Sequence, residues 1–285
     1  MKKLLPLLLI LLLTVSLCAC GKAAPEVQEP AVPEVTPEPT PEPSSPEDFE
    51  FSLLDDGTAS VTKYKGSDSE IIIPASLDGH AVTAIGDDAF SGGTMTSVTI
   101  PEGVTVIGNQ AFRECTDLIE AVIPGTVKSI GAAAFARCGE LKECTIPQGI
   151  TRIETATFAD CAKITGFTIP GGVTYIGDSA FASCAALEKV NIPEGVTEIG
   201  AFAFAGTGLK EAVIPEGVTF IGEAAFSWCP GLHSVTLPSS IPGFDFNVSF
   251  KDSTEGIKFT VPGGSDMEKL CGKQRVTYSS VSGTN

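Results

Sequence analysis

Hydrophobic and polar positions recur along most of the chain with a period of 23 residues. Ile-Pro pairs mark where the units begin, although one unit is a residue shorter and the first is longer and more divergent. The pairs define seven units: 73–99, 100–122, 123–145, 146–168, 169–191, 192–213 and 214–236. A fixed period of this length predicts a solenoid, in which each unit contacts only its neighbours.

The same positions are apolar in each unit from residue 100 onward. After the Ile-Pro pair come Val or Ile, then Ile, then Phe, then usually Cys, and last Leu or Ile. The phenylalanines are Phe112, Phe135, Phe158, Phe181, Phe204 and Phe226. One unit cannot bury these side chains alone, whereas stacked units bury them in a continuous core where each side-chain type forms a ladder.

A short strand is predicted at the end of each unit. In Leu187–Ile192, alternation directs Val190 inward and Lys189 and Asn191 outward. Pro193 ends this strand because it has no N–H to donate. A Gly after the second Ile of most units predicts a tight turn before a short helical segment. The predicted fold is a mainly β solenoid, with one parallel sheet on one side and turns and short helical segments opposite.

The repeat consensus, IPEGVTxIGxxAFxxCxxLxxVxIP, resembles the BspA-like leucine-rich repeats of bacterial surface proteins over residues 73–236. This resemblance implies a leucine-rich-repeat solenoid displayed on the cell surface. The family is associated with adhesion to host proteins and to other cells. The resemblance therefore implies a binding surface, without naming its ligand.

The N-terminus predicts export and a membrane anchor. Two lysines precede an apolar run with one Pro, which is the pattern of a secretory signal. Leu17-Cys18-Ala19-Cys20 resembles a bacterial lipobox, which implies removal of residues 1–19 and lipidation of Cys20. The alternative is a plain signal peptide cleaved near Ala19. The lipobox reading places the protein outside the cytoplasm, anchored to the bacterial membrane and displayed at the surface.

The remaining segments divide by composition. Residues 20–48 are rich in Pro and Glu and predict an extended, disordered spacer, which at ~3.1 Å per residue would span on the order of 80 Å. It is either a stalk that clears the cell wall or an ordinary linker. Residues 49–72 predict an N-terminal cap with a hairpin around Asp56-Gly57. Residues 237–285 predict a C-terminal cap.

Charge and cysteine usage narrow the function. The net charge of −17 argues against nucleic acid as a partner and leaves the lipid anchor as the contact with a membrane. Five of the nine cysteines share one ladder position, where parallel Cβ vectors disfavour disulfides and predict reduced, buried thiols. Cys144 occupies an inward strand position, and Cys271 fits neither pattern.

Catalytic and metal chemistry find no support in the sequence. No Cys-x-x-Cys motif and no Cys–His spacing typical of zinc sites occurs, so no metal is predicted. The two histidines, His80 and His233, lie in the first and last units, too far apart to share a catalytic site. We therefore predict no catalytic residue, no cofactor and no enzymatic activity.

Two surfaces compete as the predicted binding site. One is the exposed face of the sheet, formed by Glu120, Val122, Glu143, Thr145, Thr168, Lys189, Asn191, Glu211, Val213 and Thr236. The other consists of aromatic residues at positions that are polar or small in other units, namely Tyr175, Phe202, Phe220 and Trp228. Tyr and Trp are enriched in binding hot spots. The alternative for the aromatic residues is packing against the C-terminal cap or a neighbouring loop.

The sequence thus predicts a surface lipoprotein that binds a protein or glycan of a host or neighbouring cell through its solenoid. The second hypothesis is a structural scaffold of the cell envelope, or a self-associating surface protein, without a soluble ligand.

Overall fold

The computed structural model describes residues 42–253 and 256–281, all of which belong to one compact unit, residues 41–285. The predicted signal peptide, Cys20 and the spacer as far as residue 41 lie outside the described residues. Ser44 already packs against the fold, because its N–H donates to the carbonyl of Ile72 at 2.9 Å. A short 3-10 helix, Pro46–Asp48, follows.

The predicted strand forms in each unit and builds a first strand row. Its members are β3 (Glu70–Ile72), β6 (Ser97–Thr99), β8 (Glu120–Val122), β10 (Glu143–Cys144), β12 (Gly166–Thr168), β14 (Lys189–Asn191), β16 (Glu211–Val213) and β18 (Ser234–Thr236). Neighbouring members pair in parallel wherever they are hydrogen-bonded. Lys189 and Asn191 are exposed, and Leu187 and Ile192 are buried, as the alternation predicted.

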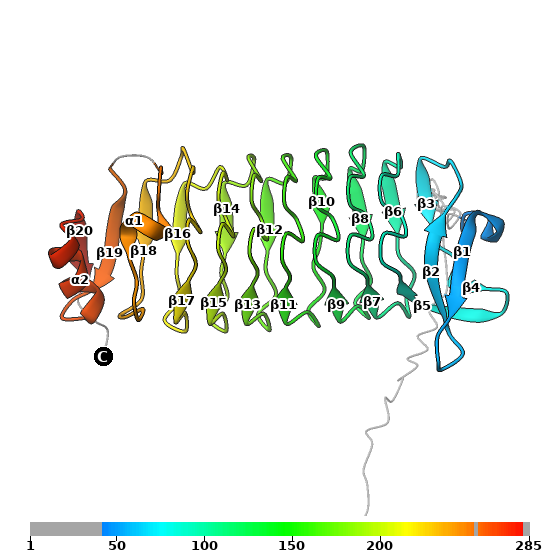
Figure 1. The fold of residues 1–285 in the computed structure, drawn as a ribbon, viewed down its shortest axis with the longest axis horizontal. Coiled ribbons are helices and arrows are strands. Elements are labelled where there is room, and N and C mark those ends of the chain that lie inside the picture. Colours follow the sequence, from blue (N-terminus) through cyan, green and yellow to red (C-terminus); the bar gives the residue numbers. More distant parts are fainter. Residues whose placement is uncertain (1–41, 254–255, 282–285) are drawn as a thin grey trace, which may run out of the picture. The chain divides into compact units, whose positions relative to one another are not determined.

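The prediction of one sheet was wrong, because each unit contains a second strand. The second strand row comprises β5 (His80–Ile85), β7 (Val106–Ile107), β9 (Ser129–Ile130), β11 (Arg152–Ile153), β13 (Tyr175–Ile176), β15 (Glu198–Ile199) and β17 (Phe220–Ile221). Figure 1 shows the two rows along the upper and lower parts of the solenoid. Most of these strands have two residues, which is too short for alternation to reveal them.

The predicted helical segment around each ladder Phe was also wrong. These residues form a series of turns, which we call the turn face. Each turn contains two residues with positive φ, such as Ala133 (54°) and Arg137 (63°), and an α-helix does not accommodate them. Hydrogen bonds between units fix this shape, since Phe135 donates its N–H to the carbonyl of Thr157 in the next unit at 2.9 Å.

The phenylalanine ladder is the centre of the core. All six ladder rings are fully buried, and neighbouring rings stack with centroids 5.1–5.6 Å apart. The stack continues at both ends, because Phe90 of the first unit stacks on Phe112 at 4.9 Å and Phe250 of the C-terminal cap stacks on Phe226 at 5.3 Å. Tyr64 closes the N-terminal end by stacking on Phe90.

The cysteine ladder lies in the core, as expected. Each thiol donates to the carbonyl of the ladder Phe in the preceding unit; for Cys184 and Phe158 the distance is 3.1 Å. Burial raises the pKa of Cys184 to about 12, which keeps this thiol protonated and unreactive at neutral pH. Ser253, in the C-terminal cap, makes the equivalent bond from its hydroxyl to Phe226. The cysteines therefore serve as small, buried hydrogen-bond donors.

The Gly that follows every second-row strand except β11 is required by space. A Cβ on Gly222 would lie 2.3 Å from the backbone nitrogen of Ala201 in the preceding unit. The equivalent distance for Gly131 is 2.6 Å, to the nitrogen of Asn109. Neither residue has positive φ. Close stacking of the units, rather than an unusual turn conformation, therefore selects Gly here.

The two caps close the ends of the solenoid differently. At the N-terminus, β1 (Phe49–Leu53) and β2 (Ala59–Tyr64) form the expected antiparallel hairpin, and β4 (Ser76–Leu77) pairs with β5. At the C-terminus follow α1 (Phe246–Ser249), β19 (Lys258–Pro262), α2 (Asp266–Gln274) and β20 (Tyr278–Val281). Strands β19 and β20 extend the first row, and Cys271 is fully buried in α2.

Candidate binding surface

Phe202 and Trp228 occupy the turn face at backbone positions that disfavour large side chains. Their φ angles are 58° and 54°, and other units carry small or polar residues there, such as Ala133 and Ser183. A left-handed conformation costs a non-Gly residue on the order of 1 kcal/mol. The stacking of the units imposes it here, because Phe202 donates its N–H to the carbonyl of Glu223 at 2.9 Å.

The two rings form a stacked pair that is partly exposed. Their centroids lie 6.2 Å apart and their planes differ by 13°. The side chain of Trp228 is half exposed, and that of Phe202 is half buried. Gly206, in the preceding unit, lies beside Trp228, because the Gly206 N–H donates to the carbonyl of Ser227. Gly206 has no side chain to cover the indole. The pair therefore presents apolar ring surface to solvent.

Tyr175 and Phe220 lie in the second strand row, in β13 and β17. Glu198 of β15 stands between them in register, so the two rings are two strands apart. The guanidinium of Arg152 sits 3.9 Å from the centroid of the Tyr175 ring, and burial raises the pKa of Tyr175. Phe220 is exposed. The structure thus unites Phe202 with Trp228, whereas Tyr175 and Phe220 belong to a different surface.

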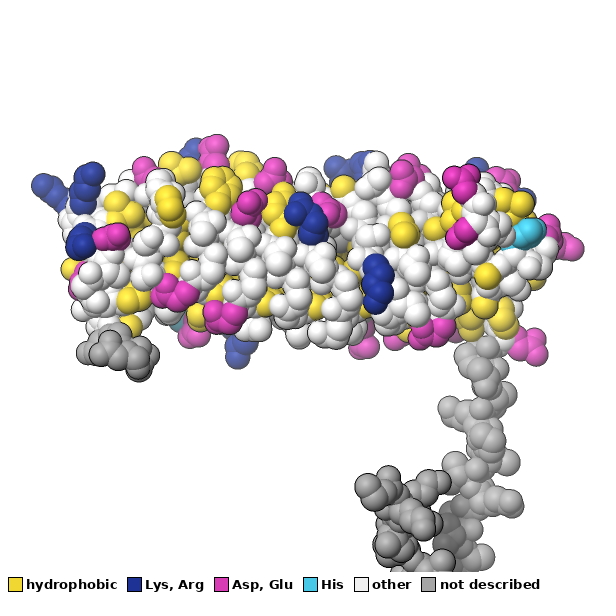
Figure 2. Space-filling model, turned by 90° about the horizontal axis from the view of Figure 1, so that it is seen from below, with side chains coloured by type: hydrophobic (Ala, Val, Ile, Leu, Met, Phe, Trp, Pro, Cys, Tyr) yellow, Lys and Arg dark blue, Asp and Glu magenta, His cyan; other side chains and the backbone are white. Residues whose placement is uncertain are grey.

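The faces built by the strands carry mixed polarity. In the first row, Val122 and Val213 are exposed, while Glu120 and Glu143 lie side by side in register. Figure 2 views the solenoid from the side of the second row, where hydrophobic side chains are scattered among uncharged ones and both signs of charge occur. Like charges placed opposite one another destabilise a sheet modestly. In the described strand rows, an exposed aromatic side chain such as Phe220 has no ring stacked on it, unlike Trp228.

Comparison with known proteins identifies the family. The model of the BspA type leucine rich repeat region matches the chain in six copies, over residues 83–207 and 197–265. The chain belongs to this family. Among solved structures, it is similar to a leucine rich cell surface protein from Faecalibacterium prausnitzii A2-165. The two are 32% identical with a TM-score of 0.65, over 78% of this chain and 71% of the other.

A second solved structure, the leucine rich repeat protein of T. pallidum, resembles this BspA-type chain at 28% identity. Its TM-score is 0.63, and the similarity covers 67% of this chain and 91% of that one. No curated protein matches the chain. The family model covers the repeats from within the first unit onward and extends to residue 265, in the C-terminal cap.

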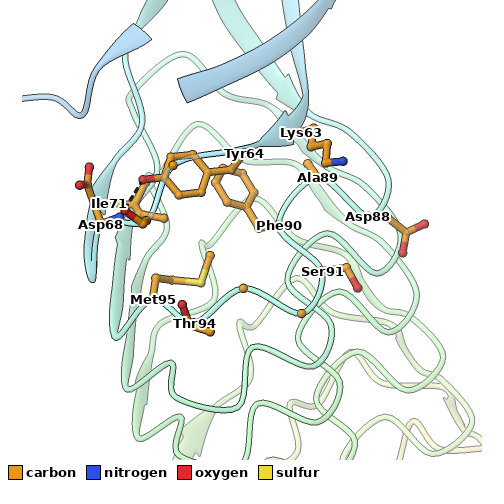
Figure 3. Close-up of a pocket in the computed structure, with 14 residues that line it drawn as sticks. Lys63, Tyr64, Asp68, Ile71, Asp88, Ala89, Phe90, Ser91, Thr94 and Met95 are labelled. Atoms are coloured by element: carbon orange, nitrogen blue, oxygen red, sulfur yellow. Dashed lines mark hydrogen bonds between the residues drawn. The ribbon is translucent and has the colours of Figure 1, made fainter. Parts of the chain in front are cut away.

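A cavity of about 300 Å³ opens where the N-terminal cap of the BspA-type solenoid meets its first unit. Figure 3 shows Tyr64 beside Phe90 above the cavity, with Met95 on its opposite side. The Tyr64 hydroxyl accepts the N–H of Asp68 at 3.2 Å. The lining contains neither His nor Cys, so it offers no pairing of a nucleophile with a histidine base.

In residues 42–253 and 256–281 of the BspA-type chain, no group of three or more His, Cys, Asp or Glu side chains is placed to hold a metal ion. The same residues include no helix of the length and apolarity needed to cross a membrane.

Proposed function

We propose that this protein is displayed on the cell surface and binds a protein or glycan partner through its solenoid, with the Phe202–Trp228 pair at the centre of the contact. The observation that carries the proposal is the stacked, partly exposed pair of rings at positions that other units fill with small or polar residues. Family membership and the cell-surface description of the Faecalibacterium protein support display at the surface.

Large aromatic side chains contribute disproportionately to binding because they bury much apolar area with little loss of conformational freedom. In this pair the rings already support one another at 6.2 Å, so little order is lost when a partner covers them. The backbone below them is held by hydrogen bonds between units, which keeps the platform rigid.

The first prediction concerns this pair. In Phe202→Ser/Trp228→Ser, affinity for a partner captured by the wild type from host matrix or bacterial surface extracts should fall at least about tenfold. The thermal midpoint should change little, because the rings are partly exposed. Phe220→Ser, on the second strand row, is the matched control and should bind normally. Unchanged affinity of the double variant rules out the pair as the contact.

The wild type and the double variant also distinguish the second candidate function, a self-associating surface protein, from binding of a different partner. If the wild type instead self-associates with increasing concentration, and the double variant remains monomeric in analytical ultracentrifugation, the partner is a second copy. Self-association that survives in the double variant places that contact elsewhere on the solenoid.

The second prediction concerns the lipid anchor proposed at Cys20. The wild type should partition into the detergent phase of Triton X-114, whereas Cys20→Ala should move to the aqueous phase because it has no acylation site. Cys18→Ala is the matched control and should still partition with detergent. Equal partitioning of the wild type and Cys20→Ala contradicts the anchor.

A further inference from the structure

Strand pairing stops in both rows at one junction, between residues 145 and 146. In the second row β9 pairs with β7 and β11 pairs with β13, but β9 and β11 belong to separate sheets. In the first row β10 and β12 are separated in the same way. Figure 1 shows the wider spacing of the ribbons at this point in both rows. Among the described units from residue 73 to 236, no other junction loses pairing in both rows.

The backbone hydrogen bonds at the next junction show which ones are missing here. There, Thr174 donates its N–H to Thr151 at 2.9 Å, and Gly177 donates to Ile153 at 2.8 Å. The equivalent donors one unit earlier are Thr151 and Glu154, which make no such bond to Lys128 or Ile130. A cavity of about 400 Å³ lies over this junction, with lining residues from both sides of it.

The sequence supplies the cause. Glu154 stands where the other units have the Gly that stacks against the preceding backbone. A Cβ at Gly131 or Gly177 would lie 2.6–2.7 Å from backbone atoms of the preceding unit. Real Cβ atoms do not approach that closely, so the unit that contains Glu154 is held away from the unit before it.

The turn face stays joined across the same junction. Ala133 donates its N–H to Thr155 at 2.8 Å, and Arg137 donates to Ala159 at 2.7 Å. The rings of Phe135 and Phe158 remain stacked, with centroids 5.6 Å apart and planes within 3°. The two halves of the solenoid are therefore connected along one side and unpaired along the other two.

We propose that this junction is a hinge. The blocks 42–145 and 146–281 rotate relative to each other about the turn face. This rotation widens and narrows the gap between the blocks in both strand rows, and it changes the curvature of the turn face. The β-strand hydrogen bonds that hold other units at a fixed angle are the ones that are missing here. Because the turn face also carries the Phe202–Trp228 pair, a partner that contacts both blocks would select one hinge angle.

The test compares distance distributions in the full-length chain. A keto amino acid is encoded at positions 105 and 219, and a spin label is attached to it. Both positions are exposed, and they lie in different blocks. The wild type should give a broad distribution by pulsed electron resonance, and Glu154→Gly should narrow it because pairing of β9 with β11 is restored. Glu154→Gln keeps the Cβ and should stay broad. Labels at positions 174 and 219, within one block, should give a narrow distribution in every variant.

Hydrogen exchange provides the second measurement. In Glu154→Gly, the amides of residues 151 and 154 should exchange at least about tenfold more slowly than in the wild type, since they gain strand hydrogen bonds. Gly177→Glu should extend the loss of protection to residues 174 and 177 and broaden the distribution for labels at 151 and 219. A wild-type distribution across the blocks as narrow as that within one block, unchanged by Glu154→Gly, overturns the hinge.

Discussion

Replacing Phe181 with Ala is expected to lower the free energy of unfolding by about 3–5 kcal/mol. The ring is fully buried and stacks on Phe158 at 5.6 Å and on Phe204 at 5.4 Å. Its loss leaves a cavity in the middle of the ladder that rigid neighbouring units cannot fill. Denaturant titration followed by circular dichroism measures the change.

Phe220→Ala is the control for this prediction, because Phe220 is the exposed aromatic residue of β17. It should change the free energy of unfolding by less than about 0.5 kcal/mol. Equal effects of the two substitutions would contradict a stability that resides in the phenylalanine ladder.

Gly222→Ala is expected to destabilise the fold by about 2–3 kcal/mol, although it adds one methyl group. The new Cβ would lie 2.3 Å from the nitrogen of Ala201, and backbone on both sides must move to admit it. The pairing of β15 with β17, which joins Ile199 to Ile221, should weaken at the same time. Thermal denaturation, together with amide exchange at residues 219 and 222, measures both effects.

The matched control is Gly125→Ala. A Cβ at Gly125 meets no atom within 4 Å, and other units carry Glu at this position, such as Glu102 and Glu194. The thermal midpoint should stay the same or rise slightly, because Ala restricts the unfolded chain. A loss of stability as large as that of Gly222→Ala would mean that spacing between units does not select Gly.

Much of the fold was accessible from the sequence because burial repeats with the period. The Phe and Cys ladders and the first strand row follow from apolar positions that recur every 23 residues. The second strand row could not be predicted in this way, since a strand such as Val106–Ile107 is too short to show alternation. The Ala-rich segments around each Phe favour a helix by propensity, but bonds to the next unit impose left-handed residues such as Ala133.

The candidate site was accessible only in part. Departure from the repeat singled out Phe202 and Trp228, but their contact joins two different positions in neighbouring units, which spacing alone does not place together. The partner of Tyr175 was within reach of sequence reasoning. Arg152 occupies the same position one unit earlier, and parallel register brings such residues side by side.

Glu154 illustrates a signal whose meaning depended on the structure. The sequence shows that it replaces a recurring Gly, and a residue with a Cβ at this position indicates that positive φ is not required there. That is correct, since none of the recurring glycines at this position has positive φ. The consequence of the replacement lies instead in the spacing between units, which requires the neighbouring backbone to be placed.

The binding proposal is tested most directly on intact cells by photo-crosslinking. Benzoylphenylalanine encoded at position 202 lies beside Trp228, and position 133 offers the same turn-face position in another unit. We expect a covalent adduct with a surface partner from position 202, and much less from position 133. Adducts of equal yield from both positions, or adducts from position 133 alone, would contradict the proposal.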